Sequence, residues 1–128
     1  MKKNYYKACK KFFVLVFVFA VTGLQSLSAS EVKIVNVKAE KQRSGWVFHV
    51  TLKHNDTGWK HYADAWRVVN KKGKELAKRT LFHPHEHEQP FTRSLSDIQL
   101  PANVGDVFVE AHDNVSGWSK QRYKVKLR

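Results

Sequence analysis

Short runs of alternating apolar and polar residues dominate the chain from residue 32 onwards. The clearest lies at 46–54, where every second residue from Trp46 to Leu52 is apolar. Alternation with a period of two predicts a strand with one buried face. Six further runs are predicted to be strands for similar reasons, at 32–40, 61–69, 75–82, 91–100, 107–112 and 119–127.

Turn-forming residues separate these runs, and no stretch after residue 30 shows a helical period. Asn70-Lys71-Lys72-Gly73 is predicted to be a hairpin turn. About seven short antiparallel strands within about a hundred residues fit an immunoglobulin- or fibronectin-like β-sandwich. A small barrel is the alternative. We therefore expect an all-β domain, with Trp46 and Trp66 in its core and Trp59 and Trp118 nearer the surface.

The N-terminal segment has a different pattern. Five lysines precede an almost wholly apolar run at 12–24, which small polar residues follow. This order is typical of a secretory signal peptide, predicted at 1–29 with cleavage near 29/30, followed by a single domain at 30–128. An uncleaved membrane anchor is the alternative, although the run is shorter than the ~20 residues that span a bilayer. Cleavage removes Cys9, the one cysteine, and with it any disulfide or thiolate metal site.

Removal of this segment lowers the net charge and changes what it implies about binding partners. The full chain carries 23 Lys and Arg against 11 Asp and Glu, a formal +12 that suggests nucleic-acid binding. The predicted mature domain carries only +7, divided into +7 over 31–79, −5 over 80–119 and +5 over 120–128. Export, and the lack of a helix-turn-helix, zinc-finger or aromatic RNA-binding pattern, argue against a nucleic-acid partner.

Basic residues occupy alternate positions in the last predicted strand, at Lys120, Arg122, Lys124 and Lys126. On a pleated strand they share one face. One interpretation is an edge strand whose lysines discourage aggregation. The other is a docking face for an anionic lipid, a polysaccharide or another envelope component.

Histidines are concentrated in the segment His83-Pro84-His85-Glu86-His87-Glu88-Gln89-Pro90. Imidazole is a common ligand of Zn, Cu and Ni in proteins, so His83, His85 and His87 are candidate metal ligands. All three are too widely spaced along an extended chain to meet on one ion, so residues from other strands would have to complete the site. Candidates by residue type are His61, Asp64, His112 and Asp113. A solvated loop between strands is the alternative.

Motifs of catalysis are missing from the sequence: it has no Gly-x-Ser-x-Gly, no phosphate-binding glycine loop and no His-Glu-x-x-His. The predicted function is therefore a non-enzymatic binding module in the periplasm or outside the cell. A periplasmic protein that binds Cu or Zn through the histidine segment is the alternative.

Two stretches carry a resemblance to known proteins. His61-Tyr62-Ala63-Asp64-Ala65-Trp66-Arg67-Val68-Val69 and the Glu-Gln-Pro-Phe-Thr-Arg-Ser-Leu run at 88–95 are similar to an uncharacterised family of small exported bacterial proteins. The resemblance implies a bacterial, periplasmic setting. It implies no particular activity.

Overall fold

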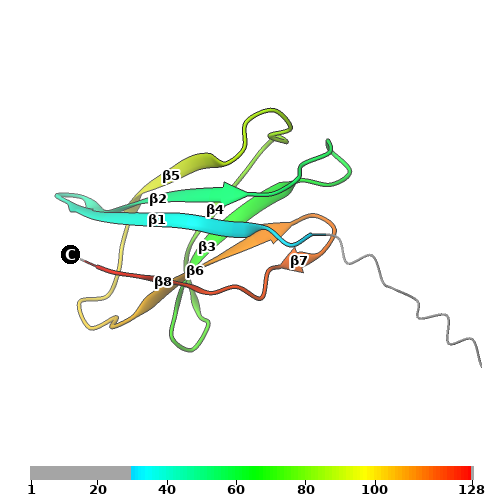
Figure 1. Ribbon diagram of the computed structural model, residues 1–128. Helices are drawn as coiled ribbons and strands as arrows, with labels where there is room; N and C mark the ends of the chain where they lie inside the picture. The colour runs from blue at the N-terminus through cyan, green and yellow to red at the C-terminus, as the bar shows by residue number, and fades with distance from the viewer. Residues whose placement is uncertain (1–29, 128) are drawn as a thin grey trace, which may run out of the picture.

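The computed structural model describes residues 30–127, so the predicted signal peptide lies outside the described residues. Within that range the chain is all-β, with no helix (Figure 1). The strands are β1 (Lys33–Gln42), β2 (Gly45–Lys53), β3 (Ala63–Asn70), β4 (Glu75–Thr80), β5 (Phe91–Ile98), β6 (Val107–Asp113), β7 (Gly117–Trp118) and β8 (Tyr123–Val125).

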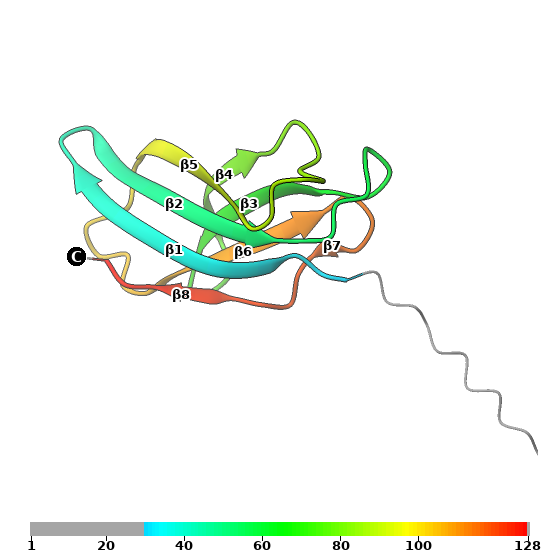
Figure 2. The same cartoon turned by 45° about the horizontal axis from the view of Figure 1, so that its top comes forward.

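The strands form two antiparallel sheets that face each other, as the view in Figure 2 shows. One sheet has the order β1-β2-β5. In the other, β4, β3 and β6 are neighbours, and β7 and β8 both pair with β6. The expected immunoglobulin- or fibronectin-like sandwich is thus confirmed as an architecture. The fourth strand lies beside the third, on the larger sheet.

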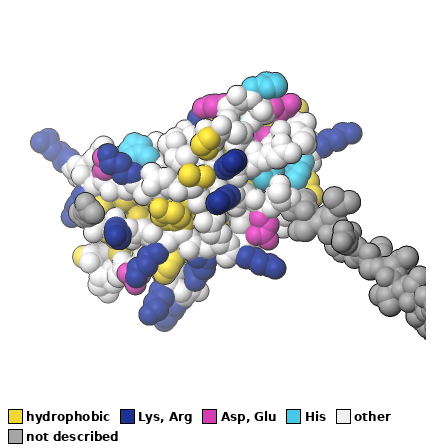
Figure 3. Space-filling model, viewed as in Figure 1, with side chains coloured by type: hydrophobic (Ala, Val, Ile, Leu, Met, Phe, Trp, Pro, Cys, Tyr) yellow, Lys and Arg dark blue, Asp and Glu magenta, His cyan; other side chains and the backbone are white. Residues whose placement is uncertain are grey.

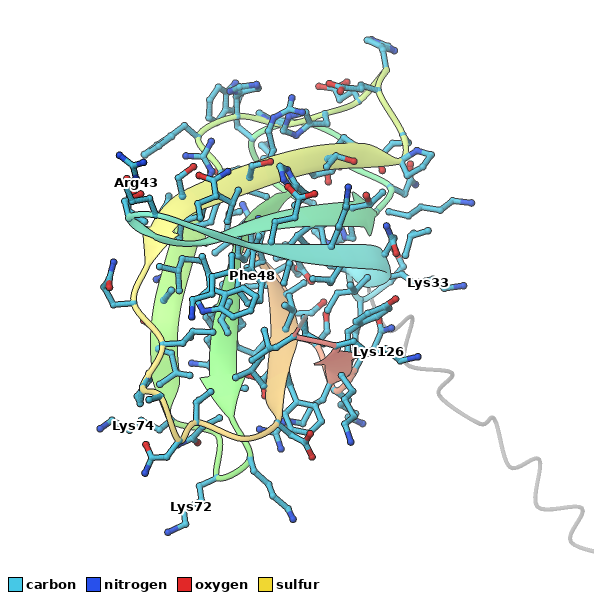
Figure 4. The ribbon with its side chains drawn as sticks, turned by 90° about the vertical axis from the view of Figure 1, so that its left-hand side faces the viewer. Lys33, Arg43, Phe48, Lys72, Lys74 and Lys126 are labelled. Carbon is cyan, nitrogen blue, oxygen red and sulfur yellow. The ribbon has the colours of Figure 1, made fainter. Side chains whose placement is uncertain are left out.

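The core lies between the sheets and comes from the alternating positions. Phe48, Val50 and Leu52 of β2 are fully buried, and Figure 4 shows Phe48 between the two layers. Trp66 and Val68 of β3 cover them from the other sheet. Complete burial of a side chain of this size contributes about 1.5–3 kcal/mol. These side chains therefore hold the sandwich together without any disulfide.

The C-terminal run differs from its prediction as one strand over 119–127. Only Tyr123–Val125 pairs with β6 as β8, and Gly117–Trp118 forms the separate β7. Between them, side chains replace the backbone ladder. Gln121 accepts a hydrogen bond from the Ile34 amide and donates one to the Ile34 carbonyl, at 2.8 and 3.1 Å. The segment therefore ties the edge of one sheet to the other.

A register shift between Ala63 and Ala65 changes which face Asp64 occupies. Simple alternation would place Asp64 on the side of Trp66 and Val68. Ala63, Trp66 and Val68 all belong to the core, whereas Asp64 contacts His112 outside it. The irregularity thus moves one carboxylate from the buried face to the outer face.

Candidate functional site

Most of the histidines gather at one end of the sandwich. There the segments 54–62, 83–90 and 113–117 lie close together, next to the start of the described chain (Figures 1 and 2). In Figure 3 this end shows the cyan histidines and several magenta carboxylates at the upper right. These segments connect strands of both sheets, so the fold brings together residues that are distant in sequence.

Asp56 is the centre of a buried hydrogen-bond network at this end. Its side chain is fully buried. One oxygen contacts Nδ1 of His54 at 2.6 Å and accepts from the Ala63 amide at 2.9 Å. The other oxygen accepts from the His85 amide at 2.8 Å. Asp56 therefore fixes the ring of His54 and holds the histidine segment against the sandwich.

His54 is buried between two acceptors. Besides the Asp56 contact at Nδ1, its Nε2 lies 2.9 Å from the backbone oxygen of Ser30. A neutral imidazole carries a single N–H, so it satisfies only one of these two acceptors. A second proton, or a cation shared by Nε2 and the carbonyl, is needed for the other.

His61 and Asp113 complete a three-residue cluster with His54. One donor atom of each of the three lies within 4.8 Å of the other two. Nε2 of His61 is 3.2 Å from Oδ1 of Asp113, yet this nitrogen and Oδ2 of the fully buried Asp113 have no hydrogen-bond partner. The other carboxylate oxygen accepts from the amides of Val115 and Ser116. The cluster thus contains two buried polar atoms that have no hydrogen-bond partner.

Within the histidine segment, His85 is buried; its Nε2 has a hydrogen-bond partner and its Nδ1 has none. Its ring stacks on Phe91 with 3.9 Å between ring centroids. Arg93 lies 2.8 Å from Nε2, and because a guanidinium only donates, this nitrogen is the acceptor. Arg93 also donates to Glu88, which lowers the pKa of that carboxyl below its usual range. His83 and His87 are exposed on the same loop.

Burial lowers the pKa of His85 below its usual 6.5, and the charges of Arg93 and His83 act in the same direction. As pH falls below 6.5, the unfolded chain takes up a proton here that the folded chain still refuses. The free energy of unfolding should therefore decrease from pH 6.5 down to the lowered pKa. In urea denaturation at a series of pH values, H85Q should flatten this part of the profile. The control H87Q, at an exposed position, should keep the wild-type slope; equal slopes in wild type and H85Q would contradict the expectation.

Asp64 and His112, two other predicted ligands, pair with each other instead of joining the cluster. Oδ1 of Asp64 lies 2.5 Å from Nδ1 of His112 on the outer face of the larger sheet. The His112 ring packs edge-on against Trp118, over which Arg67 is stacked at 3.9 Å. Of the ligands expected from sequence, the structure brings together His61 and Asp113.

The four alternating basic residues do not form one uniform face. Arg122 donates to Glu110 and is stacked over Phe108, and Lys124 pairs with Asp106 at 3.1 Å. The ammonium groups of Lys120 and Lys126 form no ion pair among residues 30–127, although the Lys120 amide donates to the Glu31 carboxylate. Lys126 lines a groove between β1 and β8. The fold uses two of the four cations in ion pairs with this chain's own carboxylates.

Sequence reasoning missed His54 and Asp56 as members of the site. Both lie where a predicted strand ends in a turn, which is the local signal that could have identified them. His54 ends the run at 46–54 and Asp113 follows the run at 107–112, but these strands belong to different sheets. Their proximity depends on how the sheets pack.

The fold and this site define an all-β sandwich domain with a buried His/Asp cluster at one end. No family model matches the chain, and no solved structure matches it. A protein of Halomicrobium mukohataei named "Putative lipoprotein" is 37% identical over 105 residues, which cover 81% of this chain and 51% of that protein. The chain thus spans about half the length of this relative. The comparison supports the expected likeness to an uncharacterised group of proteins, but this relative is archaeal rather than bacterial.

Proposed function

We propose that this chain is an exported protein that binds a divalent transition-metal cation, Zn²⁺ or Cu²⁺, through His54, His61 and Asp113. The observation that carries the proposal is the pair of unsatisfied atoms, Nε2 of His61 and Oδ2 of Asp113, both buried. An unpaired buried polar group costs about 1–3 kcal/mol. A cation bound between them would remove that cost for both.

The donor set suits these metals. Two imidazole nitrogens and one carboxylate oxygen are ligands that Zn²⁺ and Cu²⁺ accept. Asp56 holds Nδ1 of His54, the arrangement in which a metal-binding histidine offers Nε2 to the ion. Three candidate ligands, and a carboxylate that orients one of them, thus support the proposal.

One of the distances between donor atoms agrees with a shared ion, and the three donor atoms, which lie within 4.8 Å of one another, would have to move closer together to bind it. Two adjacent ligands bonded at about 2.0–2.2 Å lie ~3.0–3.5 Å apart around a four- or six-coordinate cation. Nε2 of His61 and Oδ1 of Asp113 are 3.2 Å apart. Nε2 of His54 and the Ser30 carbonyl are 2.9 Å apart, so this carbonyl is a fourth candidate ligand.

Residues of the histidine segment support the site from outside in this proposal. His85 would have to leave Arg93 to offer Nε2 to a metal, and its Nδ1, which also lacks a hydrogen-bond partner, lies 4.0 Å from Oδ2 of Asp56. His83 and His87 lie on the exposed loop beyond it and remain the alternative ligands that the sequence predicts. The proposal therefore moves the metal from the loop to the cluster beneath it.

Export is supported by the signal-like order of residues 1–29 and by the name of the relative. A lipid-attachment cysteine would follow the apolar run at 12–24, whereas Cys9 precedes it. In residues 30–127 no helix meets the length and hydropathy that a membrane span requires. From the signal-like segment and the relative's name we propose a periplasmic or secreted protein. We further propose a binding protein without catalytic activity and without a nucleic-acid partner, because the sequence carries no motif typical of either function.

Calorimetric titration of the tag-free protein with Zn²⁺, Cu²⁺ and Ni²⁺ tests the metal site. We expect one site per chain with micromolar or tighter affinity, about −8 kcal/mol or more favourable. H61Q, which changes the half-buried ligand, should weaken binding at least about tenfold, and the pair H61Q/D113N should abolish it.

The matched control is the pair H83Q/H87Q, which removes two exposed imidazoles and leaves His85 in place. This variant should retain wild-type affinity. Loss of binding in H83Q/H87Q together with full retention in H61Q would place the metal on the loop and overturn the proposal. Absence of a binding isotherm for all three cations would overturn it as well.

A further inference from the structure

A cavity lies at the opposite end of the sandwich from the histidines. It has a volume of about 610 Å³, within the range of about 300–1,000 Å³ typical of small-molecule sites. The turn between β1 and β2, the connection between β5 and β6, and the C-terminal Leu127 surround it. Figure 1 shows these segments meeting at the left, near the marked C-terminus.

The lining of this cavity combines apolar side chains with two cations. Trp46, Leu100 and Val104 are partly buried apolar residues packed against the core. Lys41 and Arg43 also line the cavity, are exposed, and have no acidic partner among the described residues. An apolar surface bordered by unpaired positive charge is complementary to a molecule that is apolar with one anionic end.

Lys41 lies at a position of β1 where the alternation predicts an apolar residue. On β1, Val37 and Ala39 pack against the core at alternate positions, and Lys41 is the next residue in that series. Its cross-strand partner is Trp46. An inward-facing charge on an edge strand also discourages aggregation. Protection against aggregation would not require a cavity next to Lys41 or a second cation, Arg43, beside it. Both features are present, and both favour ligand binding.

The wall of the cavity is held in a defined shape. Nε2 of Gln99 donates to the backbone oxygens of Ser44 and Asp97, and the Ser44 hydroxyl donates to the Asp97 carboxylate at 2.5 Å. Asp97 adopts a positive φ of 58°, which is unfavourable for a residue with a side chain. A Cβ at Gly45 would lie 2.8 Å from the Ile98 carbonyl oxygen, so only glycine permits this approach. Such pre-organisation lowers the entropy lost when a ligand binds.

Two acidic residues lie near the cavity. Asp106 pairs with Lys124, whereas Asp97 accepts from the uncharged Ser44 hydroxyl and keeps its negative charge. Lys41 and Arg43, both without an acidic partner among the described residues, outnumber it. The field at the mouth therefore favours anions.

We propose that this cavity binds an amphipathic anion, with an acyl chain against Trp46, Leu100 and Val104 and its carboxylate or phosphate head near Lys41 and Arg43. This site is distant from the metal cluster and independent of the proposed metal function. The sequence placed an anionic partner on the alternating basic residues of the last predicted strand. Because Arg122 and Lys124 of that strand are paired with this chain's own carboxylates, we place the anion in this cavity instead.

Titration with decanoate, below its micellar concentration, tests the proposal. We expect saturable binding with Kd below about 1 mM and a change in tryptophan fluorescence. Decyltrimethylammonium, with the same chain and the opposite charge, should bind at least about tenfold more weakly, and butyrate should not bind measurably. W46F should remove most of the fluorescence change.

The variant pair K41E/R43E should weaken decanoate binding at least about tenfold and strengthen binding of the cationic analogue. The control pair K71E/K72E makes the same charge change on the exposed turn between β3 and β4, outside the cavity, and should leave affinity within about twofold. Circular dichroism verifies that each variant is folded. Equal loss in both pairs, equal binding of the two head groups, or no binding of decanoate would overturn the proposal.

Discussion

Replacing Asp56 by alanine should remove a large part of the stability of this domain. The substitution leaves three buried donors, the His54 ring and the amides of Ala63 and His85, without their acceptor. Each unsatisfied buried group costs about 1–3 kcal/mol, so we expect a loss of ~3–9 kcal/mol. The total stability of a domain of this size is about 5–15 kcal/mol. Urea denaturation monitored by tryptophan fluorescence measures the difference.

Two further variants show whether the lost hydrogen bonds are the cause. D56N keeps one acceptor oxygen and should fall between wild type and D56A. D106A removes an equally charged residue from an exposed pair with Lys124, and it should change stability by less than about 1 kcal/mol. If D56A were no more destabilising than D106A, Asp56 would not be the centre of the buried network.

Zinc should raise the melting temperature of the wild-type protein strongly. A ligand that binds only the folded state stabilises it by about 2.7 kcal/mol at a concentration of one hundred times Kd. For a domain of about one hundred residues, this corresponds to a shift of ~10 °C or more. A thermal melt with and without Zn²⁺ at neutral pH measures it.

Variants separate a specific shift from general metal binding by histidine. H61Q should lose most of the zinc-dependent shift in melting temperature. Without zinc it should melt close to the wild-type temperature, because Nε2 of His61 makes no hydrogen bond that the substitution would remove. H83Q should keep the shift, since His83 lies on the exposed loop. An unchanged shift in H61Q, or its disappearance in H83Q, would contradict the assignment of the site.

We expect the metal and the amphipathic anion to bind independently of each other. The His/Asp cluster and the cavity lined by Lys41 and Arg43 lie at opposite ends of the sandwich (Figure 1). The core of Phe48, Val50 and Trp66 separates them. The two sites share no residue, so we expect neither ligand to change the affinity of the other.

Much of the architecture is a local property of the sequence. Alternation from Trp46 to Leu52 predicted a strand with one buried face, and Phe48, Val50 and Leu52 are indeed fully buried. The turn predicted at Asn70-Lys71-Lys72-Gly73 joins β3 and β4, with Gly73 at a positive φ of 84°. Such features depend on residues a few positions apart, so the sequence alone determined them.

Tertiary structure decided where chemistry can take place. His54 and Asp113 are distant in sequence and end strands of different sheets, so only the packing of the sheets makes them neighbours. A register shift moved Asp64 to the outer face, where it pairs with His112. The histidine segment is the most conspicuous pattern in the sequence, but its His85 is engaged by Arg93 and Asp56. Residue type and spacing identify groups that can bind a cation; burial and long-range contacts decide which of them are left without a partner.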